Sequence, residues 1–226
     1  MPAPSISCPA AARVASILVG IGAVRITTAQ PFVYTSGWAS PVYVDTRLLM
    51  SDVSLRTEIM DLAATAMAPV VEERGINAVV GAESSGIAFA AWLAERLALP
   101  LLYLRKRPMG WGQAARLEGR LPPAACLLYV DDVTTDGRSK LAAAKALRQG
   151  DAAVDDVLVI LDYAIYPRTA GLSDAAAPRI HALTHWPDLL AALRAEGGLS
   201  AEAERTLAAF DADPVRWSLE NGGVGA

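Results

Sequence analysis

Residues 126–140 read CLLYVDDVTTDGRSK, an apolar run followed by two adjacent carboxylates and a small polar turn. A short, continuous apolar run of this kind is typical of a strand buried on both faces of a parallel sheet. Side chains along a strand alternate between its two faces, so Asp131 and Asp132 cannot both point into the core. We therefore expect both carboxylates at the end of the strand, where they avoid the free-energy cost of burial.

The residues after the carboxylates are suited to binding a phosphate. The segment TTDGRS, residues 134–139, places hydroxyls and backbone N–H groups at the start of an expected helix. A helix N-terminus attracts anions through its unpaired N–H groups and its dipole. Carboxylates that can bind sugar hydroxyls lie next to this cradle, so the stretch predicts a sugar-phosphate site. The GxxxxGK[ST] and GxGxxG nucleotide motifs do not occur in the sequence.

Strands and helices alternate along most of the chain. We expect helices over residues 10–20, 51–74, 86–97, 139–148, 186–194 and 201–210, and strands over residues 76–83, 100–106, 126–132, 154–163 and 179–185. Such alternation predicts an α/β fold, a parallel sheet flanked by helices with right-handed crossovers. Two β-rich pieces in PFVYTSGWASPVYVDTR, residues 31–47, precede this pattern.

Polar segments follow three successive strands of the expected sheet. They are GAESSGI at residues 81–87, RKRPMGWGQAARLEG at residues 105–119 and DDVTTDGRS at residues 131–139. Ligands of open parallel sheets bind beyond the carboxyl ends of the strands. Each segment alone has the composition of an ordinary turn. Three of them in register favour one shared binding crevice.

Composition narrows the class of protein. The chain has 226 residues, 53% of them hydrophobic, and a formal net charge of −4. This length predicts a single domain, with a small N-terminal hood mainly from residues 20–50, a core over about residues 51–185 and C-terminal helices over residues 186–226. The acidic balance argues against nucleic-acid binding, and the apolar runs are too short to span a membrane. Two cysteines form no disulfide framework, which predicts a cytoplasmic location.

The quoted stretch resembles the phosphoribosyl pyrophosphate motif of type I phosphoribosyltransferases, an apolar strand with two acidic residues and a Thr- and Gly-rich loop. Residues 31–47 resemble the hood segment of orotate phosphoribosyltransferases, and residues 103–119 resemble their mobile catalytic loop. Residues 81–100 occupy the place of the pyrophosphate loop in that family. Order and spacing agree over roughly residues 22–166, most of the chain.

The resemblance implies transfer of a phosphoribosyl group from phosphoribosyl pyrophosphate to orotate, which gives orotidine 5′-monophosphate and pyrophosphate in pyrimidine biosynthesis. It implies Mg²⁺ bound mainly through donor oxygens, and a homodimer with shared active sites. The implied residues are Asp131 and Asp132 for the ribose hydroxyls, Thr134, Thr135, Asp136, Gly137, Arg138 and Ser139 for the 5-phosphate, and Ser84, Ser85, Gly86, Arg105 and Lys106 for the pyrophosphate. Of these, the two aspartates, Arg105 and Lys106 would be catalytic.

The sequence departs from the family pattern at several positions that are usually cationic. Met109 replaces the usual lysine of the mobile loop, Thr35 a lysine of the hood, and Tyr163 an arginine that many members use for the orotate carboxylate. Alternation places Tyr43, Asp45 and Arg47 on one face of a strand. Because an arginine can bind a carboxylate with two parallel hydrogen bonds, we expect Arg47 to contact orotate, with Tyr43 beside it. The alternative for Arg47 is a surface salt bridge.

Two other functions fit the same residues. The missing cations favour a phosphoribosyltransferase for another base, and Met109 favours a regulator that binds the donor without turnover. The hood sequence favours orotate over another base. A regulator is less favoured, because the sequence contains no DNA-binding domain or basic patch to transmit the signal.

Overall fold

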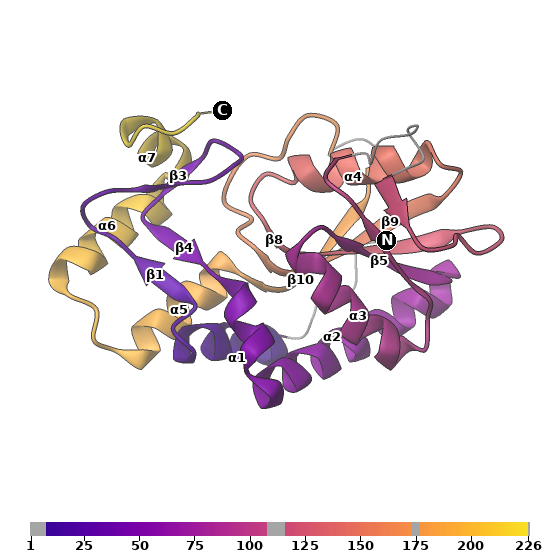
Figure 1. The fold of residues 1–226 in the computed structure, drawn as a ribbon. Helices are drawn as coiled ribbons and strands as arrows, with labels where there is room; N and C mark the ends of the chain where they lie inside the picture. Colours follow the sequence, from indigo (N-terminus) through magenta and orange to yellow (C-terminus); the bar gives the residue numbers. More distant parts are fainter. Residues whose placement is uncertain (1–7, 108–115, 173–176, 226) are drawn as a thin grey trace.

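The computed structural model describes residues 8–107, 116–172 and 177–225 of the chain (Figure 1). Its central sheet has six strands in the order β10-β9-β8-β5-β6-β7. These strands are β5 (Ala78–Ala82), β6 (Leu101–Leu104), β7 (Leu117–Glu118), β8 (Cys126–Thr134), β9 (Ala153–Asp162) and β10 (Arg179–His185). Neighbouring strands are parallel except β7, which pairs antiparallel with β6 at the sheet edge. The predicted parallel sheet is therefore confirmed, with one short antiparallel addition.

Helices cover both faces of this sheet. The helices are α1 (Cys8–Gly20), α2 (Val53–Arg74), α3 (Ser85–Leu97), α4 (Arg138–Arg148), α5 (Trp186–Glu196), α6 (Ala201–Ala212) and α7 (Pro214–Glu220). Figure 1 shows α4 on one side of the sheet and α1, α2 and α3 on the other. Two buried apolar clusters correspond to these two sides. Among the described residues, no helix is both long and apolar enough to cross a membrane.

Local signals set where the helices begin and end. The Asp52 carboxylate accepts a hydrogen bond from the Leu55 N–H and caps α2, which ends at Gly75 in the left-handed conformation. All six predicted helices are confirmed to within a few residues. The seventh helix, α7, was not predicted. It is short and begins at Pro214, directly after Asp213, whose carboxylate accepts a hydrogen bond from the Arg216 N–H.

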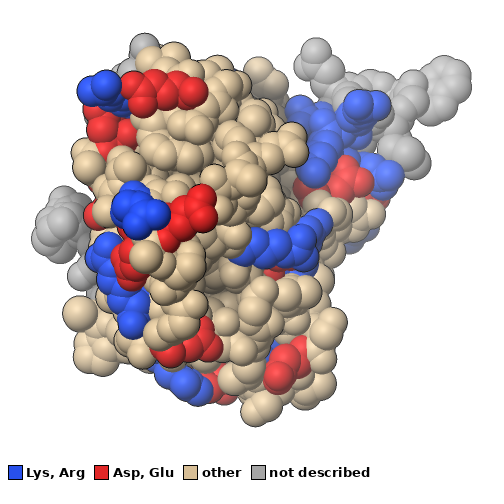
Figure 2. Space-filling view, turned by 90° about the vertical axis from the view of Figure 1, so that its left-hand side faces the viewer, with Lys and Arg blue, Asp and Glu red and all other residues tan. Residues whose placement is uncertain are grey.

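The N-terminal hood consists of two small antiparallel sheets. One pairs β1 (Val24–Ile26) with β4 (Val42–Val44), and the other pairs β2 (Phe32–Val33) with β3 (Ala39–Ser40). A 3₁₀ helix, η1 (Thr46–Ser51), leads from the hood to α2. Figure 1 shows the hood strands next to α6 and α7, to one side of the central sheet. On that side of the molecule, Figure 2 shows basic and acidic side chains in small mixed groups.

A buried carboxylate joins the last two strands of the sheet. The Asp156 side chain, 2% exposed, lies 2.7 Å from Nε2 of His181 and accepts two hydrogen bonds from Arg179, at 3.0 and 2.7 Å. Burial alone would raise the pKa of Asp156, but the hydrogen bonds from His181 and Arg179 outweigh burial and lower it to about 2. The ionised form therefore stabilises the fold.

We predict that Asp156→Asn lowers the free energy of unfolding by up to about 2 kcal/mol at neutral pH. A carboxyl pKa lowered by folding stabilises the protein above the unfolded pKa, near 3.8, and this stabilisation is lost as the pH falls toward 2. Denaturant unfolding at several pH values should show the difference between variant and wild type shrinking between pH 4 and 2. Asp155→Asn, at the neighbouring exposed carboxylate, is the control. A difference that stays constant over this range would contradict the prediction.

Candidate active site

Asp131 and Asp132 lie inside β8, and the predicted position at the end of the strand is wrong. The strand continues to Thr134, which pairs with Asp162 of β9. Asp131 is tolerated there because Nζ of Lys140 lies 2.8 Å from its carboxylate. The Lys140 side chain is 3% exposed, and Nζ also donates to the Val133 carbonyl. Lys140 was not predicted as a site residue, although a lysine in the first turn of the following helix was visible in the sequence.

Among the described residues, no basic side chain forms an ion pair with Asp132, which faces a different environment. Its carboxylate accepts a hydrogen bond from the Thr46 hydroxyl at 3.3 Å, and it lines a cavity. Burial and the negative charge of Asp131 raise the pKa of Asp132, while Lys140 and a hydrogen bond from Ser85 oppose this shift. The site thus holds one compensated carboxylate and one that is available for a ligand.

The loop between β8 and α4 is held rigidly from within. Asp136, 4% exposed, accepts a hydrogen bond from the Arg138 N–H at 3.0 Å, and its other oxygen lies 3.4 Å from the Arg138 guanidinium. Gly137 has φ +79, and a Cβ there would lie 2.1 Å from a methyl of Leu172, so this turn requires glycine. The loop therefore presents the first turn of α4 in a fixed position, as a phosphate cradle requires.

The segment after β9 supports this loop from outside. The Thr169 N–H donates to the Asp136 carbonyl at 2.9 Å. Arg168 forms an ion pair with Asp162 and donates to the Thr135 carbonyl at 3.3 Å. Sequence reasoning did not identify Arg168, which lies outside the quoted motifs.

A second loop, between β5 and α3, lies close to the acidic strand. A Cβ at Gly86 would lie 2.5 Å from the Val130 carbonyl oxygen, so only glycine allows α3 to approach β8 this closely. Ser84 precedes the helix and Ser85 begins it. The start of α3 therefore lies against β8 at Val130 and Asp131.

The two basic residues after β6 are tied to neighbouring strands. The Lys106 N–H donates to the Glu83 carboxylate at 2.6 Å, which links the ends of β6 and β5. The Arg105 guanidinium lies 2.9 Å from Glu118 of β7, while its buried Nε has no hydrogen-bond partner among the described residues. Met109, at which the sequence departs from the family pattern, lies outside the described residues.

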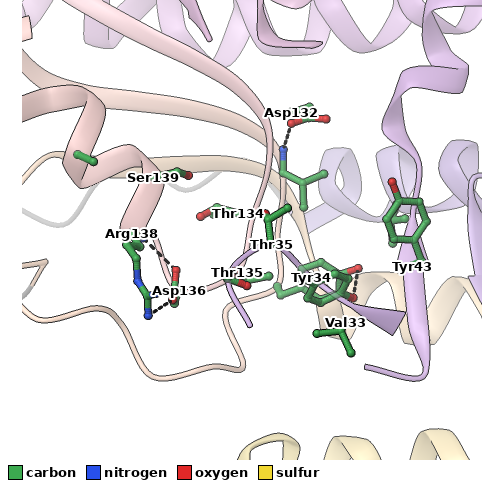
Figure 3. A pocket seen from close by; sticks show the side chains of 15 residues that line it. Val33, Tyr34, Thr35, Tyr43, Asp132, Thr134, Thr135, Asp136, Arg138 and Ser139 are labelled. Carbon is green, nitrogen blue, oxygen red and sulfur yellow. Dashed lines mark hydrogen bonds and ion pairs between the residues drawn. The ribbon is translucent and has the colours of Figure 1, made fainter. Parts of the chain in front are cut away.

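A cavity of about 480 Å³ lies between the hood and the acidic strand. The hood contributes residues 33–36, 43 and 44, β8 and its loop contribute residues 132–136, and α4 contributes residues 138, 139 and 142, with Tyr163 completing the wall. Figure 3 shows Arg138 and Asp136 at one end and Tyr43 at the other, with Asp132 between them. Of the predicted site residues, the cavity brings together Tyr43, Asp132, Thr134, Thr135, Asp136, Arg138 and Ser139. The lining does not include Asp131, Gly137, Arg47, Ser84, Ser85, Gly86, Arg105 or Lys106.

Tyrosine hydroxyls dominate the hood side of the cavity. The hydroxyl oxygens of Tyr34 and Tyr163 lie 2.8 Å apart, and the Tyr34 hydroxyl also donates to the Val42 carbonyl. Burial raises the pKa of both phenols, so both are protonated at neutral pH. Tyr34 was not predicted, because nothing in its spacing distinguished it from a core aromatic residue. Trp38, by contrast, is a core residue stacked on Tyr166.

Arg47 lies in η1, after β4 has ended at Val44. Its Nε and Nη2 atoms lie 2.6 and 2.8 Å from the two carboxylate oxygens of Asp45, and Nη2 lies 3.3 Å from the Tyr43 hydroxyl. The three side chains do meet, but the expected strand face is wrong, because β4 ends at Val44 and Asp45 caps η1. In this arrangement Arg47 forms the salt bridge that was its alternative role, and its contact with orotate stays a prediction.

The site lies at the carboxyl edge of a parallel sheet, beside a small hood. It combines a strand that carries two aspartates with a loop suited to a phosphate. This arrangement defines a type I phosphoribosyltransferase. No family model matches the chain. The chain is 38% identical over 207 residues to the orotate phosphoribosyltransferase of Ruegeria sp. (strain TM1040), with 92% of each chain covered. It is 37% identical over 211 residues to that of Agrobacterium fabrum (strain C58 / ATCC 33970), covering 93% of this chain and 91% of the relative.

The fold also matches that of a solved structure of this family. The crystal structure of orotate phosphoribosyltransferase from Aeropyrum pernix matches with a TM-score of 0.61 and 30% identity, over 82% of this chain and 99% of that one. The chain belongs to the orotate phosphoribosyltransferase family.

We predict that Lys140→Met lowers the free energy of unfolding by about 3 kcal/mol, because it leaves Asp131 charged and without its buried partner. Adding Asp131→Asn to this variant should recover part of the loss, since no unpaired charge then remains at that position. Lys145→Met, at an exposed lysine of the same helix, is the control and should change stability by less than about 0.5 kcal/mol. Equal losses for the two lysine variants in denaturant unfolding would show that the pair does not stabilise β8.

Proposed function

We propose that the cavity between the hood and β8 is where the chain carries out the activity of its family, transfer of a phosphoribosyl group from phosphoribosyl pyrophosphate to orotate. The observation that carries this proposal is that one cavity joins Asp132, the loop of residues 134–139 and the hood. The carboxylate is suited to ribose hydroxyls and the loop to the 5-phosphate. The hood then closes the side from which the acceptor base approaches.

In the reaction, the bond between the anomeric carbon and the pyrophosphate oxygen breaks and a bond to a ring nitrogen of orotate forms. The proton of that nitrogen is lost and leaves with pyrophosphate. Positive charge develops on the sugar and negative charge on the leaving group. We assign stabilisation of the leaving group to the N-terminus of α3 with Ser84, Ser85 and Gly86, and to Arg105 and Lys106. No covalent nucleophile is needed, and the protein acts mainly by positioning its two substrates.

The donor set fits Mg²⁺ bound chiefly through substrate oxygens. Among the described residues, no group of three or more Asp, Glu, His or Cys side chains is arranged to hold a metal ion. Asp132 offers one hard oxygen ligand. Burial and the negative charge of Asp131 raise the pKa of Asp132, and a bound cation would oppose both effects. When bound with the donor, Mg²⁺ supplies positive charge to the pyrophosphate.

The acceptor end is lined by uncharged hydrogen-bond donors. Tyr163 and Thr35 are in the cavity wall at positions where cations are usual in the family, and they stand beside the hydroxyls of Tyr34 and Ser36. Several neutral donors can offset the lost hydration of an anion, as one cation does. Arg47 is near this end, 3.3 Å from the Tyr43 hydroxyl, and it would reach the carboxylate only by loosening its pair with Asp45.

The proposal includes a homodimer, in which Arg105 and Lys106 would serve the active site of the neighbouring subunit. It also includes a cytoplasmic location, which is the compartment expected from the cysteine content. Another base, or a regulator without turnover, is less favoured. The reason is that the relatives, which match more than 90% of this chain, are named orotate phosphoribosyltransferases.

The direct test of the activity is depletion of orotate in the presence of the donor and Mg²⁺. We expect one pyrophosphate released for each orotate consumed, and no consumption of adenine or uracil in its place. Donor binding without turnover of orotate would reject the proposed function in favour of the regulator, and turnover of a different base would reject the assigned acceptor.

We predict opposite effects of Asp132→Asn on stability and on donor binding. Because burial and Asp131 raise the pKa of Asp132, its charged form destabilises the empty protein, and the variant should melt at a higher temperature at neutral pH. This gain should vanish as the pH falls through the raised pKa. The added stability from saturating donor and Mg²⁺ should shrink, since the ribose hydroxyls lose a charged partner.

Asp151→Asn, at an exposed carboxylate in the turn before β9, is the matched control and should change neither quantity. If Asp132→Asn shifts the melting temperature with donor as much as the wild type does, Asp132 does not bind the ribose.

The residue that recognises the acceptor can be identified with two variants. Arg47→Ala should raise the KM for orotate strongly, with donor binding nearly intact, if Arg47 binds the carboxylate. Tyr163→Phe should raise it by about tenfold if the hydroxyl donates to orotate, the cost of one hydrogen bond to a charged group. An unchanged KM in Arg47→Ala assigns that residue to the Asp45 salt bridge, and unchanged values in both variants would place the acceptor elsewhere.

A further inference from the structure

The hairpin of β2 and β3 has little stabilisation of its own. Each strand has two residues, and the two strands pair only with each other in the described sheets. An isolated two-stranded hairpin is marginally stable in water. The segment that connects these strands nevertheless supplies Tyr34, Thr35 and Ser36 to the cavity wall. Other contacts must therefore fix the position of this wall.

The C-terminal segment makes such contacts with the hairpin. Ser218 of α7 is fully buried, and its hydroxyl accepts a hydrogen bond from the Ala39 N–H at 2.9 Å and donates to the Val224 carbonyl at 2.7 Å. The Val224 N–H in turn donates to the Gly37 carbonyl at 2.9 Å. A Cβ at Gly223 would lie 2.4 Å from the Ala39 nitrogen, so the tail lies directly against β3. Figure 1 shows α7 and the C-terminus beside this strand.

Aromatic side chains connect the hairpin to the C-terminal helices on a second side. The Trp38 ring stacks on Tyr166 with centroids 4.7 Å apart, and Tyr166 meets Phe210 of α6 at 6.3 Å. Phe210 packs edge-on against Trp217 of α7 at 5.5 Å. The Tyr166 hydroxyl also donates to the Ala39 carbonyl at 3.3 Å. Ala39 is thus held at its N–H by Ser218 and at its carbonyl by Tyr166.

The cavity side of the same hairpin touches the phosphate loop. The Thr135 hydroxyl donates to the Ser36 hydroxyl at 3.1 Å. A shift of the hairpin away from its C-terminal support therefore moves the hood wall relative to the loop. The loop itself has further support from Asp136 and from the Thr169 N–H, so we expect it to move less than the hood wall.

We propose that Ser218 and the tail of residues 221–225 position the hood wall for acceptor binding. Ser218 acts through Ala39 and is a positioning residue, since it does not line the cavity. The inference rests on the proposed placement of orotate at the hood wall. Weakening this support should therefore lower the affinity for orotate and leave donor binding unchanged.

The test compares Ser218→Ala with Ser200→Ala in the full chain. Ser200 also makes a hydroxyl hydrogen bond, to the Ala203 N–H at 3.1 Å at the start of α6, but it does not contact the hairpin. Ser218→Ala removes both hydrogen bonds of this hydroxyl, and we expect the lost bond to the Ala39 N–H alone to raise the KM for orotate by about tenfold. The stabilisation by donor and Mg²⁺ should stay at the wild-type value. Ser200→Ala should lower the melting temperature but change neither the KM for orotate nor the stabilisation by donor and Mg²⁺.

A second variant tests the same support without removing a hydrogen-bonding group. Gly223→Ala places a methyl against Ala39 and should raise the KM for orotate in the same way, whereas Gly20→Ala, with nothing within 4 Å of its added Cβ, should not. A wild-type KM in both Ser218→Ala and Gly223→Ala would overturn the inference, as would equal losses of orotate and donor affinity. A wild-type protein that consumes no orotate would reject the proposed function instead.

Discussion

The buried ion pair between Lys140 and Asp131 determines how the active site is built. Two adjacent carboxylates inside a strand of a parallel sheet repel each other and lose hydration, so this arrangement requires compensation. Lys140 lies in the first turn of α4 and reaches back to Asp131, to the Val133 carbonyl and to the Ser139 hydroxyl. The pair therefore joins β8 to α4 and sets the path of the loop between them.

Compensation of only one carboxylate has a functional consequence. In the part of the chain that the structure describes, no basic side chain forms an ion pair with Asp132, which faces the cavity, where a sugar hydroxyl or a cation can bind it. The same loop geometry presents the start of α4 to the cavity, with Gly137 required by both its positive φ and the contact with Leu172. On the donor side, contacts within the loop between β8 and α4 fix its position. On the acceptor side, the hairpin of β2 and β3 packs against the C-terminal helices.

Much of this fold was predictable from short-range patterns. Apolar runs and helical periodicity gave the strands and helices of the core, and the order of motifs predicted the hood, the two phosphate-side loops and the acidic strand. The end of β8 was not predictable, because the position of Asp131 depends on Lys140, which is brought to it by the turn at Gly137. Similarly, Arg47 was expected on a strand that ends three residues earlier, and its partner Asp45 became evident only from the geometry. The support of the hood by Ser218 involves contacts across nearly 180 residues, which no local pattern carries.

Titration of the aspartate side chains by carbon-13 NMR tests the asymmetry of the two carboxylates most directly. In the free protein, we expect the Asp132 carboxyl to titrate above the ordinary value near 3.9, and this signal should be missing from Asp132→Asn. Because interacting groups share their titrations, the Asp131→Asn variant should also lower the pKa of Asp132. An Asp132 signal that titrates at or below the ordinary value, and that does not respond to Asp131→Asn, would contradict the account.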